Sequence, residues 1–341
     1  MNNSQFDKSK IPWYLQRKYA FIFLTVLIIF SCKNDEPPPS QILSFDQIIS
    51  PGLVTLHLKT NLSQLFSEEK EEEYQAAMIS LSNKSENIFD GEIMVRPRGV
   101  TRKEMCDTPP LKLKLGKGES KLELKLVTPC REGDEYQQLI FKEHLIYKMY
   151  NQFSDFSLRV QIVKLNFEDT EKQWPGFEKY GFVIEDDKDL ASRMEAVLIE
   201  PHQELKFIDQ NQYSVFTVFQ YLIGNTDWNL KKRHNIELVC RKNSKSPIPV
   251  PYDVDYCGLV NAPYAIPHPQ LPIKNVRDRY FMWSGKKVDG FEKVIELFHT
   301  KRDTLLNLVN NCQYLSSDSK QEMKEYIDEF YESQDLVFLQ N

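Results

Sequence analysis

The feature that most constrains the fold of this chain is a change of hydrophobic periodicity near residue 185. Before that point, apolar and charged residues alternate with period two, which predicts strands at 76–82, 91–99, 111–115 and 121–128. One long helix is expected at about 135–153, and the runs SLRVQIVKLNF and KYGFVIE predict further strands. After that point the spacing becomes helical, and the segment 211–224 ends in Gly224, a residue typical of a helix C-terminus. The pattern predicts an α+β protein, with a β-rich part that contains one long helix and a second part that is mainly helical.

Acidic residues gather between Tyr221 and Asp255, in the runs YLIGNTDWNLKKRHNIELV and PIPVPYDVD. Mg²⁺ prefers one or two carboxylates plus substrate phosphates, and phosphoryl transfer needs one further Asp to orient the accepting hydroxyl. We therefore predict Asp227 as the catalytic residue and Asn235, Asp253 and Asp255 as metal ligands. The alternative for Asp227 is a loop carboxylate that bonds its own backbone.

Asp253 and Asp255 flank a single residue, Val254, so an extended backbone would place both carboxylates on the same side. Two like charges this close repel each other unless a cation or a base lies between them. We therefore favour a metal site at this pair. The alternatives are a salt bridge to Arg277 or Arg279, and a solvated pair.

Several motifs resemble those of atypical kinase-like families. The pattern IGNTD, HN and YDVD resembles the catalytic loop and metal-binding Asp of HipA-type kinases, and the RG and D-x-D pattern is similar to that of CotH-type spore-coat kinases. The runs RGVTRKEMCDTPPL, KLVTPC, KEHLIY, NTDW and PYDVDYCGLVNAPYA look like those of a group of Bacteroidota-type exported lipoproteins. The resemblance covers roughly residues 91–280.

This resemblance implies a two-lobed protein-kinase-like fold, with a β-rich N-lobe at 46–184 and a mainly helical C-lobe at 185–341. It also implies ATP or another nucleotide as the cofactor, together with Mg²⁺ or Mn²⁺. The sequence differs from the kinase pattern in two respects. Asp227 and Asn235 are separated by seven residues, a wider spacing than usual, and no glycine-rich phosphate loop is visible.

Glu143 lies in an apolar stripe of the long predicted helix. The residues of this stripe recur at spacings of four and three, which puts them on one face: Leu139, Glu143, Ile146, Tyr150 and Phe153. A carboxylate buried there is costly unless it is paired or protonated, and the expected partner is a Lys on the preceding strand. The resemblance implies the same pair, because kinases join the helix Glu to the strand Lys that holds the ATP phosphates. The alternative is a Glu at the edge of the stripe that reaches solvent.

We favour Lys125 as this nucleotide-binding lysine, because it lies on the strand immediately before the helix. Lys112, which resembles a Lys of the CotH-type families, is the second candidate. Both alternate with leucines, so the alternative is that these lysines only solvate one face of a sheet.

The turn between the first strands, VRPRGVTRKEMCDTPP, carries Arg96, Arg98 and Arg102. In a kinase-like lobe this turn covers the phosphates, and we predict that Arg98 and Arg102 bind them through bidentate contacts; ordinary surface arginines are the alternative. By resemblance, Val183–Asp186 connects the two lobes and brings Glu185 to the nucleotide, with backbone hydrogen bonds to adenine. The alternative is that these acids cap the following helix.

Cys106 and Cys130 flank the strand-like runs LKLKL and KLELKLV, so a disulfide between them would staple a hairpin. An odd number of cysteines follows Cys32, which leaves at least one free thiol. The spacings of Cys and His do not match a structural zinc site. Trp228 and Tyr252 are expected to pack in the core.

Residues 1–31 are predicted to be a lipoprotein signal peptide. Basic residues precede Ala20–Phe30, a mostly apolar run of eleven residues that is too short to span a bilayer as a helix, which needs about 20. Ser31 precedes Cys32, the predicted lipidation site, and residues 32–45 are the expected tether. The alternative is a secretory signal with an incidental Cys.

The leader carries a net charge of +3 and the whole chain −6, so the mature 310 residues carry −9. An acidic surface argues against nucleic acid as a partner. We therefore predict an exported kinase, anchored by its lipid to a bacterial membrane at the periplasmic or outer-membrane surface. It would transfer a phosphoryl group from a Mg-nucleotide to a hydroxyl on a protein or small molecule. The alternative is a catalytically inactive kinase-like surface binding module.

Overall fold

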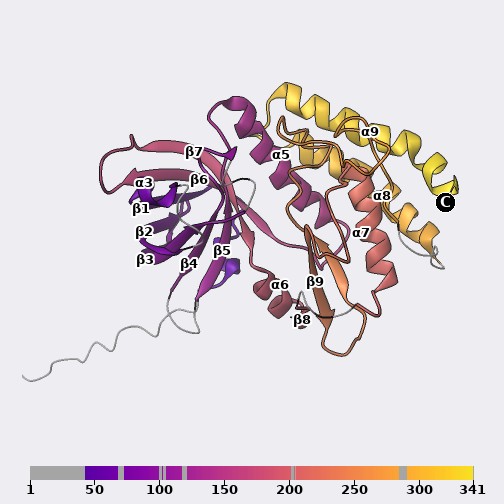
Figure 1. Cartoon of the computed structure of the whole chain (residues 1–341), viewed down its shortest axis with the longest axis horizontal. Coiled ribbons are helices and arrows are strands. Elements are labelled where there is room, and N and C mark those ends of the chain that lie inside the picture. The colour runs from indigo at the N-terminus through magenta and orange to yellow at the C-terminus, as the bar shows by residue number, and fades with distance from the viewer. Residues whose placement is uncertain are drawn as a thin grey trace, which may run out of the picture. The chain divides into compact units, whose positions relative to one another are not determined.

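Seven strands close into a barrel in the order β1-β2-β3-β4-β5-β7-β6 (Figure 1). Neighbouring strands are antiparallel except β1 and β6, whose parallel pairing closes the barrel. Alternate residues of each strand point inward, so leucines such as Leu56 and Leu124 pack together inside. The strands are β1 (Val54–Thr60), β2 (Gln75–Ser82), β3 (Asn87–Pro97), β4 (Leu111–Leu115), β5 (Leu122–Val127), β6 (Val160–Asp169) and β7 (Phe177–Glu185).

This computed structural model describes residues 43–67, 73–99, 102, 105–116, 121–200, 203, 205–283 and 290–340, with side chains up to residue 333. The described residues belong to one unit, Leu43–Asn341. The predicted signal peptide, Cys32 and most of the predicted tether lie outside the described residues. None of the helices that the structure describes is long and apolar enough to cross a membrane.

Helices dominate the chain after the barrel. Helix α5 (Asp134–Tyr150) lies between β5 and β6 in sequence, and its inner face joins the core that also contains residues of the later helices. Those helices are α6 (Asp187–Arg193), α7 (Gln210–Ile223), α8 (Phe291–Asn310) and α9 (Ser317–Gln340). A small antiparallel sheet in the order β10-β9-β8 joins β8 (Ala196–Leu198), β9 (Ile236–Arg241) and β10 (Ile248–Pro251). Two short helices precede β1 and β2: α2 (Phe45–Ile48) and α3 (Leu62–Leu65).

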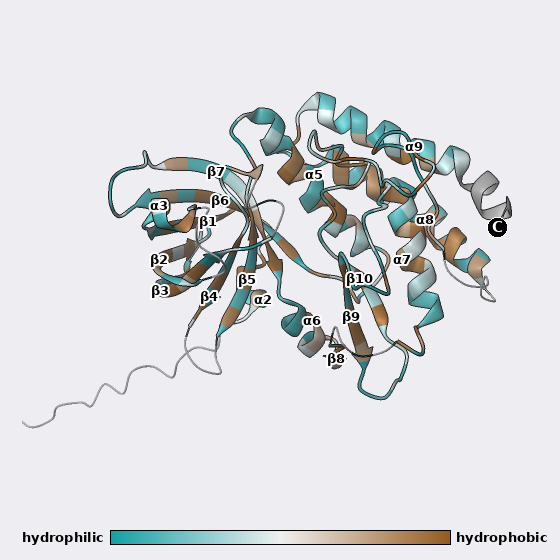
Figure 2. Ribbon diagram, viewed as in Figure 1, coloured by the Kyte–Doolittle hydropathy of each residue, from teal (hydrophilic) through white to brown (hydrophobic). Residues whose placement is uncertain are grey.

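Helix α7 is buried from Tyr213 to Ile223, although Figure 2 shows both hydrophobic and hydrophilic residues along it, and it ends where the predicted catalytic loop begins. Gly224 caps it in the left-handed conformation, with φ of 64°. A side chain at this position would collide with Tyr326 Oη, which lies 1.9 Å from the place of a Cβ atom. The cap therefore requires glycine for its conformation and for the close approach of α9.

The described elements confirm the predicted α+β class and the change of periodicity near residue 185. Each predicted strand is present, and the long predicted helix is observed as α5 (Asp134–Tyr150). Strand β1 (Val54–Thr60) was not predicted. It alternates buried and exposed residues as the other strands do, and its parallel partner β6 is more than a hundred residues away in sequence.

Candidate functional site

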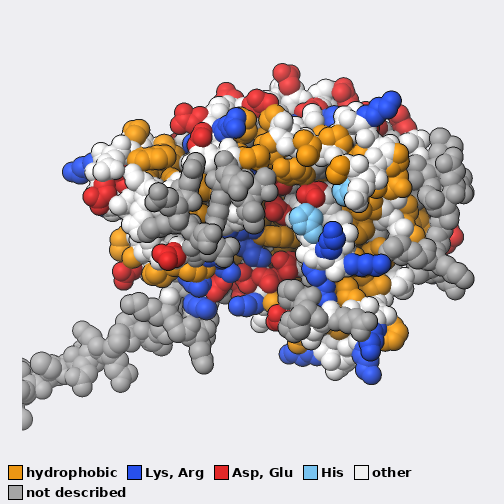
Figure 3. Space-filling view, viewed as in Figure 1, with side chains coloured by type: hydrophobic (Ala, Val, Ile, Leu, Met, Phe, Trp, Pro, Cys, Tyr) orange, Lys and Arg blue, Asp and Glu red, His pale blue; other side chains and the backbone are white. Residues whose placement is uncertain are grey.

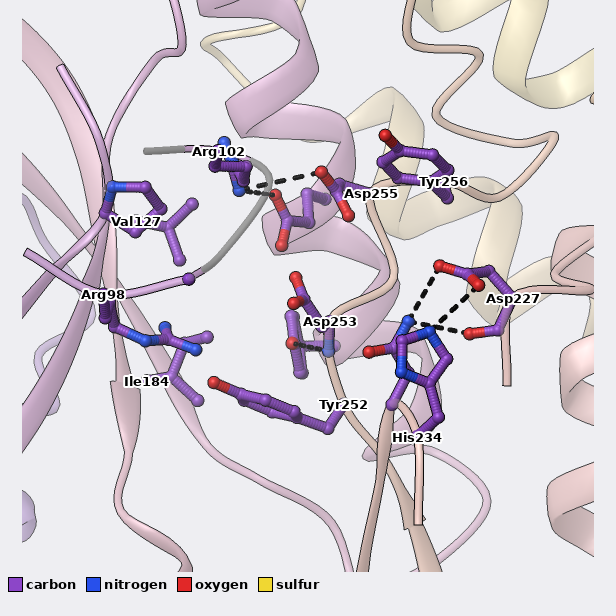
Figure 4. A pocket seen from close by; sticks show the side chains of 15 residues that line it. Arg98, Arg102, Val127, Ile184, Asp227, His234, Tyr252, Asp253, Asp255 and Tyr256 are labelled. Atoms are coloured by element: carbon purple, nitrogen blue, oxygen red, sulfur yellow. Dashed lines mark hydrogen bonds and ion pairs between the residues drawn. The ribbon is translucent and has the colours of Figure 1, made fainter. Parts of the chain in front are cut away.

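A cavity of about 440 Å³ lies where the barrel, α5 and the loops after α7 and β10 meet (Figure 4). Charged and aromatic side chains dominate its wall. Figure 3 shows acidic and basic side chains gathered beside a histidine at the middle of the drawn face. The lining residues are Arg98, Gly99, Arg102, Pro110, Val127, Glu143, Tyr147, Ile184, Asp227, His234, Asn235, Tyr252, Asp253, Asp255 and Tyr256.

Asp227 is held by its own loop. Its backbone N–H donates to Asn225 Oδ1 at 2.9 Å, and Asn235 Nδ2 donates both to the Asp227 carbonyl oxygen at 2.7 Å and to Asp227 Oδ2 at 3.0 Å. Both partners of Nδ2 are acceptors, so the amide nitrogen must face Asp227 and Oδ1 of Asn235 is left for another ligand. The structure thus brings the predicted catalytic Asp and one predicted metal ligand into direct contact.

His234 is a site residue that sequence reasoning missed. Its Nε2 lies 3.1 Å from Asp227 Oδ1, and its side chain is 56% exposed. A carboxylate accepts hydrogen bonds, so Nε2 is the protonated nitrogen of this pair. The quoted dipeptide HN, which ends in Asn235, contained the signal, because a His beside a ligand residue shares its loop.

Asn235 and Asp253 both adopt the left-handed conformation, with φ of 52° in each. Residues other than glycine rarely adopt this conformation, and such residues cluster at functional sites. The backbone N–H of Asp253 donates to Tyr147 Oη of α5 at 3.0 Å. The extended backbone predicted for 253–255 is therefore wrong at Asp253, although both carboxylates of the pair line the same cavity.

Asp255 is buried at the inner end of the cavity. Its Oδ2 accepts a hydrogen bond from Tyr264 Oη at 3.1 Å and lies 3.8 Å from Arg102 Nη1. Burial and repulsion from Asp253 raise the pKa of Asp255 to about 6, against the opposing effect of Arg102. The predicted salt bridge to Arg277 or Arg279, the alternative to a metal, is wrong. Those arginines pair instead with Glu322 and Glu329 of α9.

Glu143 is buried on α5, as the helix face predicted, but its partner is Arg102 rather than Lys125. Arg102 Nη1 lies 3.9 Å from Glu143 Oε2. Burial raises the pKa of Glu143 well above its usual range, and Arg102 offsets only part of this effect. Arg102 Nη1 thus lies close to the carboxylates of both Glu143 and Asp255, and Figure 4 shows its contact with Asp255. We call these three residues the buried triad.

The two predicted lysines face other acids. Lys125 Nζ lies 3.1 Å from Asp187 Oδ1 and 3.8 Å from Glu237 Oε1, and it stands 4.6 Å from the centre of the Tyr252 ring. Burial would raise the pKa of Asp187, but Lys125 lowers it below the usual value. The predicted pair of Lys125 with Glu143 is therefore wrong. On β5, the residue that lines the cavity next to Glu143 is Val127.

Lys112 is also occupied elsewhere. Its Nζ forms an ion pair with Glu123 Oε2 at 2.6 Å, across the β4–β5 pair, and lies 4.0 Å from Asp186 Oδ2. Neither it nor Lys125 is among the described residues that line the cavity. The positive charge at the cavity wall comes from Arg98 and Arg102.

Glu185 has a structural role instead of the predicted contact with a nucleotide. Its carboxylate is fully buried and is bound by Arg159 and Arg193, with distances of 2.8 Å and 3.0 Å. Its backbone N–H donates to the Arg159 carbonyl oxygen at 2.9 Å. Asp186, the next residue, caps α6 by accepting from the Lys188 N–H, as the alternative prediction for these acids required.

Tyr252 packs, partly buried, against the main core as expected and also lines the cavity, and Trp228 packs in a cluster with Phe216 as expected. The guanidinium of Arg98 stands 5.4 Å from the centre of the Tyr252 ring. Cation–π attraction of this kind joins the turn after β3 to the segment after β10.

Cys106 and Cys130 form a disulfide, the pairing that the sequence suggested. Cys106 precedes β4 and Cys130 follows β5, so the bond ties the open end of this hairpin. The free cysteines of the described residues are Cys240, Cys257 and Cys312.

The described residues include no group of three or more His, Cys, Asp and Glu side chains that could by itself hold a metal ion. The oxygen atoms of Asp253, Asp255 and Asn235 instead match the preference of Mg²⁺ for one or two carboxylates, with phosphate oxygens completing the shell. Repulsion between the two aspartates contributes to the raised pKa of Asp255, and a cation would relieve it. The residues present therefore fit a cation that arrives with a phosphate ligand.

No protein-family model and no curated protein matches this chain. Among solved structures, the chain is similar to the crystal structure of a Helicobacter pylori proinflammatory kinase, CtkA. The match covers 64% of this chain and 89% of that chain, at 12% sequence identity and a TM-score of 0.35. A likeness of that extent supports no inference about the activity of this chain.

Proposed function

We propose that the unit Leu43–Asn341 is an atypical, two-lobed kinase-like phosphotransferase. It would transfer a phosphoryl group from ATP or another nucleotide, with Mg²⁺ or Mn²⁺, to a hydroxyl on a protein or small molecule. The observation that carries this proposal is that one cavity collects an orienting Asp, three oxygen ligands and two arginines from distant segments: Asp227, Asn235, Asp253, Asp255, Arg98 and Arg102. Phosphoryl transfer depends mainly on positioning and on compensation of phosphate charge, and this set of groups can supply both.

Asn235 Oδ1, Asp253 and Asp255 would hold the cation. When bound, a Mg²⁺ or Mn²⁺ ion would bridge the protein to the phosphates and neutralise charge on them. The left-handed backbone at Asn235 and Asp253 turns these two side chains into the cavity instead of along a strand. The hydrogen bond from the Asp253 N–H to Tyr147 Oη fixes that turn against α5.

Asp227 would orient the accepting hydroxyl and take its proton. Each of its carboxylate oxygens already has one donor, His234 Nε2 at 3.1 Å and Asn235 Nδ2 at 3.0 Å. A carboxylate oxygen can accept more than one hydrogen bond, so the side chain is held in place and still has acceptor capacity. Its side chain is 37% exposed, which gives an incoming hydroxyl access.

A neighbouring cavity of about 530 Å³ offers room for the nucleoside. It shares His234, Asn235 and Tyr252 with the first cavity, and its far wall includes Asp187 and Leu238. Together the two cavities fall in the size range of small-molecule sites, about 300 to 1,000 Å³. Asp187 is the first residue of α6, directly after Val183–Asp186, the connection that the kinase resemblance assigns to the base.

Nucleotide binding by purified residues 32–341 tests the proposal. Calorimetric titration with ATP should give saturable binding with Mg²⁺ or Mn²⁺ and much weaker binding in excess EDTA, because the cation joins the acids to the phosphates. Incubation with γ-labelled ATP should then release or transfer label. Absence of binding with either ion, together with a melting temperature that ATP and Mg²⁺ do not change, would refute the proposal.

A catalytically inactive binding module is the second candidate. One observation favours it: Lys125, the lysine expected to hold phosphates, is already bound by Asp187 and Glu237, and Asp255 is engaged by Arg102 and Tyr264. This candidate predicts no transfer of label under any ionic condition. Nucleotide binding without turnover would support it over the enzyme.

We also propose that the chain is exported and anchored by a lipid on Cys32. The Cys106–Cys130 disulfide supports export, because such bonds persist in oxidising compartments. Metabolic labelling with a fatty acid should mark the wild type and fail with Cys32→Ser. Label on the variant would contradict this site of lipidation.

A further inference from the structure

The turn between β3 and β4 brings both cavity arginines to the site. We call its described residues, 98, 99, 102 and 105–110, the arginine turn. The Arg98 N–H donates to the Pro110 carbonyl oxygen at 2.8 Å, and the Cys106 N–H donates to the Arg102 carbonyl oxygen at 3.0 Å. The second bond joins residues four apart, the spacing of an α-helical hydrogen bond, so it ties the backbone of Arg102 to Cys106.

The arginine turn is fastened to the segment 127–130 after β5. The Cys106–Cys130 disulfide is the covalent link. Four hydrogen bonds join the same segments: Asp107 N to Cys130 O at 2.9 Å, Thr108 Oγ1 to Pro129 O at 2.6 Å, Thr128 Oγ1 to Thr108 O at 2.8 Å, and Arg102 Nη2 to Thr128 O at 3.3 Å. Three of them lie within two residues of the disulfide in sequence, so they depend on the geometry that it imposes.

The guanidinium of Arg102 has donors left over. It is 8% exposed, and its Nε is buried without a hydrogen-bond partner among the described residues. Its Nη1 is 3.9 Å from Glu143 and 3.8 Å from Asp255, which is beyond hydrogen-bond distance for both. Buried donors are nearly always satisfied, so this geometry indicates an oxygen-bearing ligand in the cavity.

None of the described residues that line the cavity is a lysine. Val127 is the β5 residue at the cavity wall, and the ammonium group of Lys125 is paired with Asp187. The cation beside Glu143 therefore comes from a turn, which is less constrained than a strand. A turn needs an additional constraint to hold one guanidinium between two buried acids, and the disulfide supplies it.

We propose that Arg102 contacts the phosphate groups of the bound nucleotide and that the Cys106–Cys130 disulfide is its positioning element, so that the oxidised chain binds phosphates much more tightly than the reduced chain. The proposal rests on the proposed function for the identity of the ligand. It assigns Arg102 the place that a strand lysine was expected to fill. The disulfide itself does not contact the ligand.

Reduction of the disulfide is a two-electron step. The Sγ–Sγ bond breaks, each sulfur becomes a thiol, and two protons are taken up. With tris(2-carboxyethyl)phosphine the phosphine supplies the electrons and becomes the phosphine oxide, whose oxygen comes from water. Removal of the phosphine and oxidation by oxidised glutathione should restore the bond.

The experiment compares affinities of the full chain in four forms: oxidised, reduced, reoxidised, and with both cysteines replaced (Cys106→Ser with Cys130→Ser). The probes are ATP with Mg²⁺ and inorganic triphosphate with Mg²⁺, which carries the same anionic groups without a nucleoside. Reduction and the double replacement should each weaken both probes about tenfold, and reoxidation should restore the affinity. Cys312→Ser, at a free cysteine outside the site, is the matched control and should change neither probe.

Arg102 variants separate positioning from folding. Arg102→Ala should weaken both probes about 10- to 100-fold, the scale of a lost charge-assisted hydrogen bond, and added methylguanidinium should restore part of the affinity. The affinity of Arg102→Lys for each probe should lie between those of the wild type and Arg102→Ala. Arg241→Met, at a surface pair with Asp209, is the control.

Each outcome decides a separate point. Unchanged affinities after reduction, with only the melting temperature lowered, would show a merely stabilising disulfide and overturn the inference. Binding of triphosphate but not ATP, with the expected redox dependence, would support the inference and refute the proposed nucleotide. Binding of neither probe by the oxidised wild type would overturn both.

Discussion

Two clusters of charged residues face the same cavity and are built in opposite ways. The buried triad has side chains that are 10%, 3% and 6% exposed for Arg102, Glu143 and Asp255. In what we call the loop cluster, Asp227 and His234 are 37% and 56% exposed, with Asn235 beside them. The triad therefore carries the cost of desolvated charge, whereas water still compensates the loop cluster.

The clusters also differ in where their residues lie along the chain. The loop cluster comes from one loop between α7 and β9, and short-range hydrogen bonds assemble it. The triad joins the arginine turn, α5 and the segment after β10. The difference teaches that the triad should affect stability and the loop cluster mainly chemistry.

The largest effect is expected from removing the cation of the triad. Arg102→Met would strand two buried carboxylates and lower the free energy of unfolding by roughly 3–5 kcal/mol, measured by urea denaturation. Arg241→Met, where the ion pair with Asp209 is partly exposed, should cost less than about 1 kcal/mol. Equal losses at the two sites would remove the distinction between buried and exposed pairs.

The second prediction addresses the loop cluster. Asp227→Asn should lower phosphoryl transfer by at least about 10²-fold, the scale of a lost general base, while the free energy of unfolding changes by less than about 1 kcal/mol. Initial rates with γ-labelled ATP and urea curves measure the two quantities. Asp303→Asn, at a side chain that is 89% exposed, is the control for the charge change. A large loss of stability with Asp227→Asn would contradict a mainly chemical role.

The third prediction uses the other face of α5, where His144 follows Glu143. Burial lowers the pKa of His144 from 6.5 to about 3, with a smaller effect of Lys148. Between about pH 3 and 6.5 the unfolded chain therefore binds a proton at His144 that the folded chain does not bind. Neutral His144 thus costs no stability above about pH 6.5, and the free energy of unfolding declines as the pH falls from 6.5 toward 3. At pH 4.5, two units below 6.5, the loss attributable to His144 should be about 3 kcal/mol, at about 1.4 kcal/mol per unit.

His144→Phe removes the titrating group and keeps a ring against Phe182. Urea midpoints of the wild type and this variant, measured from pH 4.5 to 8, isolate the contribution of His144. Parallel pH profiles for the two proteins would show that His144 is not the group that titrates.

The smallest effect is expected at Lys125, the lysine that was predicted to pair with Glu143 but pairs with Asp187. A double-mutant cycle with Lys125→Met and Asp187→Asn should give a coupling energy of about 1 kcal/mol, because the pair is partly buried at 3.1 Å. The cycle that pairs Lys125→Met with Glu143→Gln should be additive. A measurable coupling energy between Lys125 and Glu143 would instead support the original prediction that Lys125 pairs with Glu143 and binds phosphates.

Part of the site was predictable because its information is local. Asp227 and Asn235 belong to one loop, and Asp253 and Asp255 flank one residue. Their spacing was enough to predict them as one site, and all four line the same cavity. The helical stripe likewise placed Glu143 inside. His234 was missed although it is equally local, because only the Asn of the dipeptide HN was assigned a role.

The errors share one cause, which is the choice of partner. The stripe showed that Glu143 needs a cation, but both β5 and the arginine turn offered one, and only the folded structure shows Val127 of β5, not Lys125, at the cavity wall. Glu185 was assigned to a nucleotide, yet Arg159 and Arg193 enclose it.

The sequence by itself determined the α+β class, the barrel strands after β1, the long helix α5, and the segments that carry the oxygen ligands, because periodicity and short spacings are properties of neighbouring residues. The tertiary structure decided which cation meets which buried acid. That choice depends on desolvation and on distances between segments that meet only when the barrel closes and α5 packs against the later helices. Arg102 rather than Lys125 faces Glu143, and it comes from a turn that the Cys106–Cys130 disulfide joins to the segment after β5.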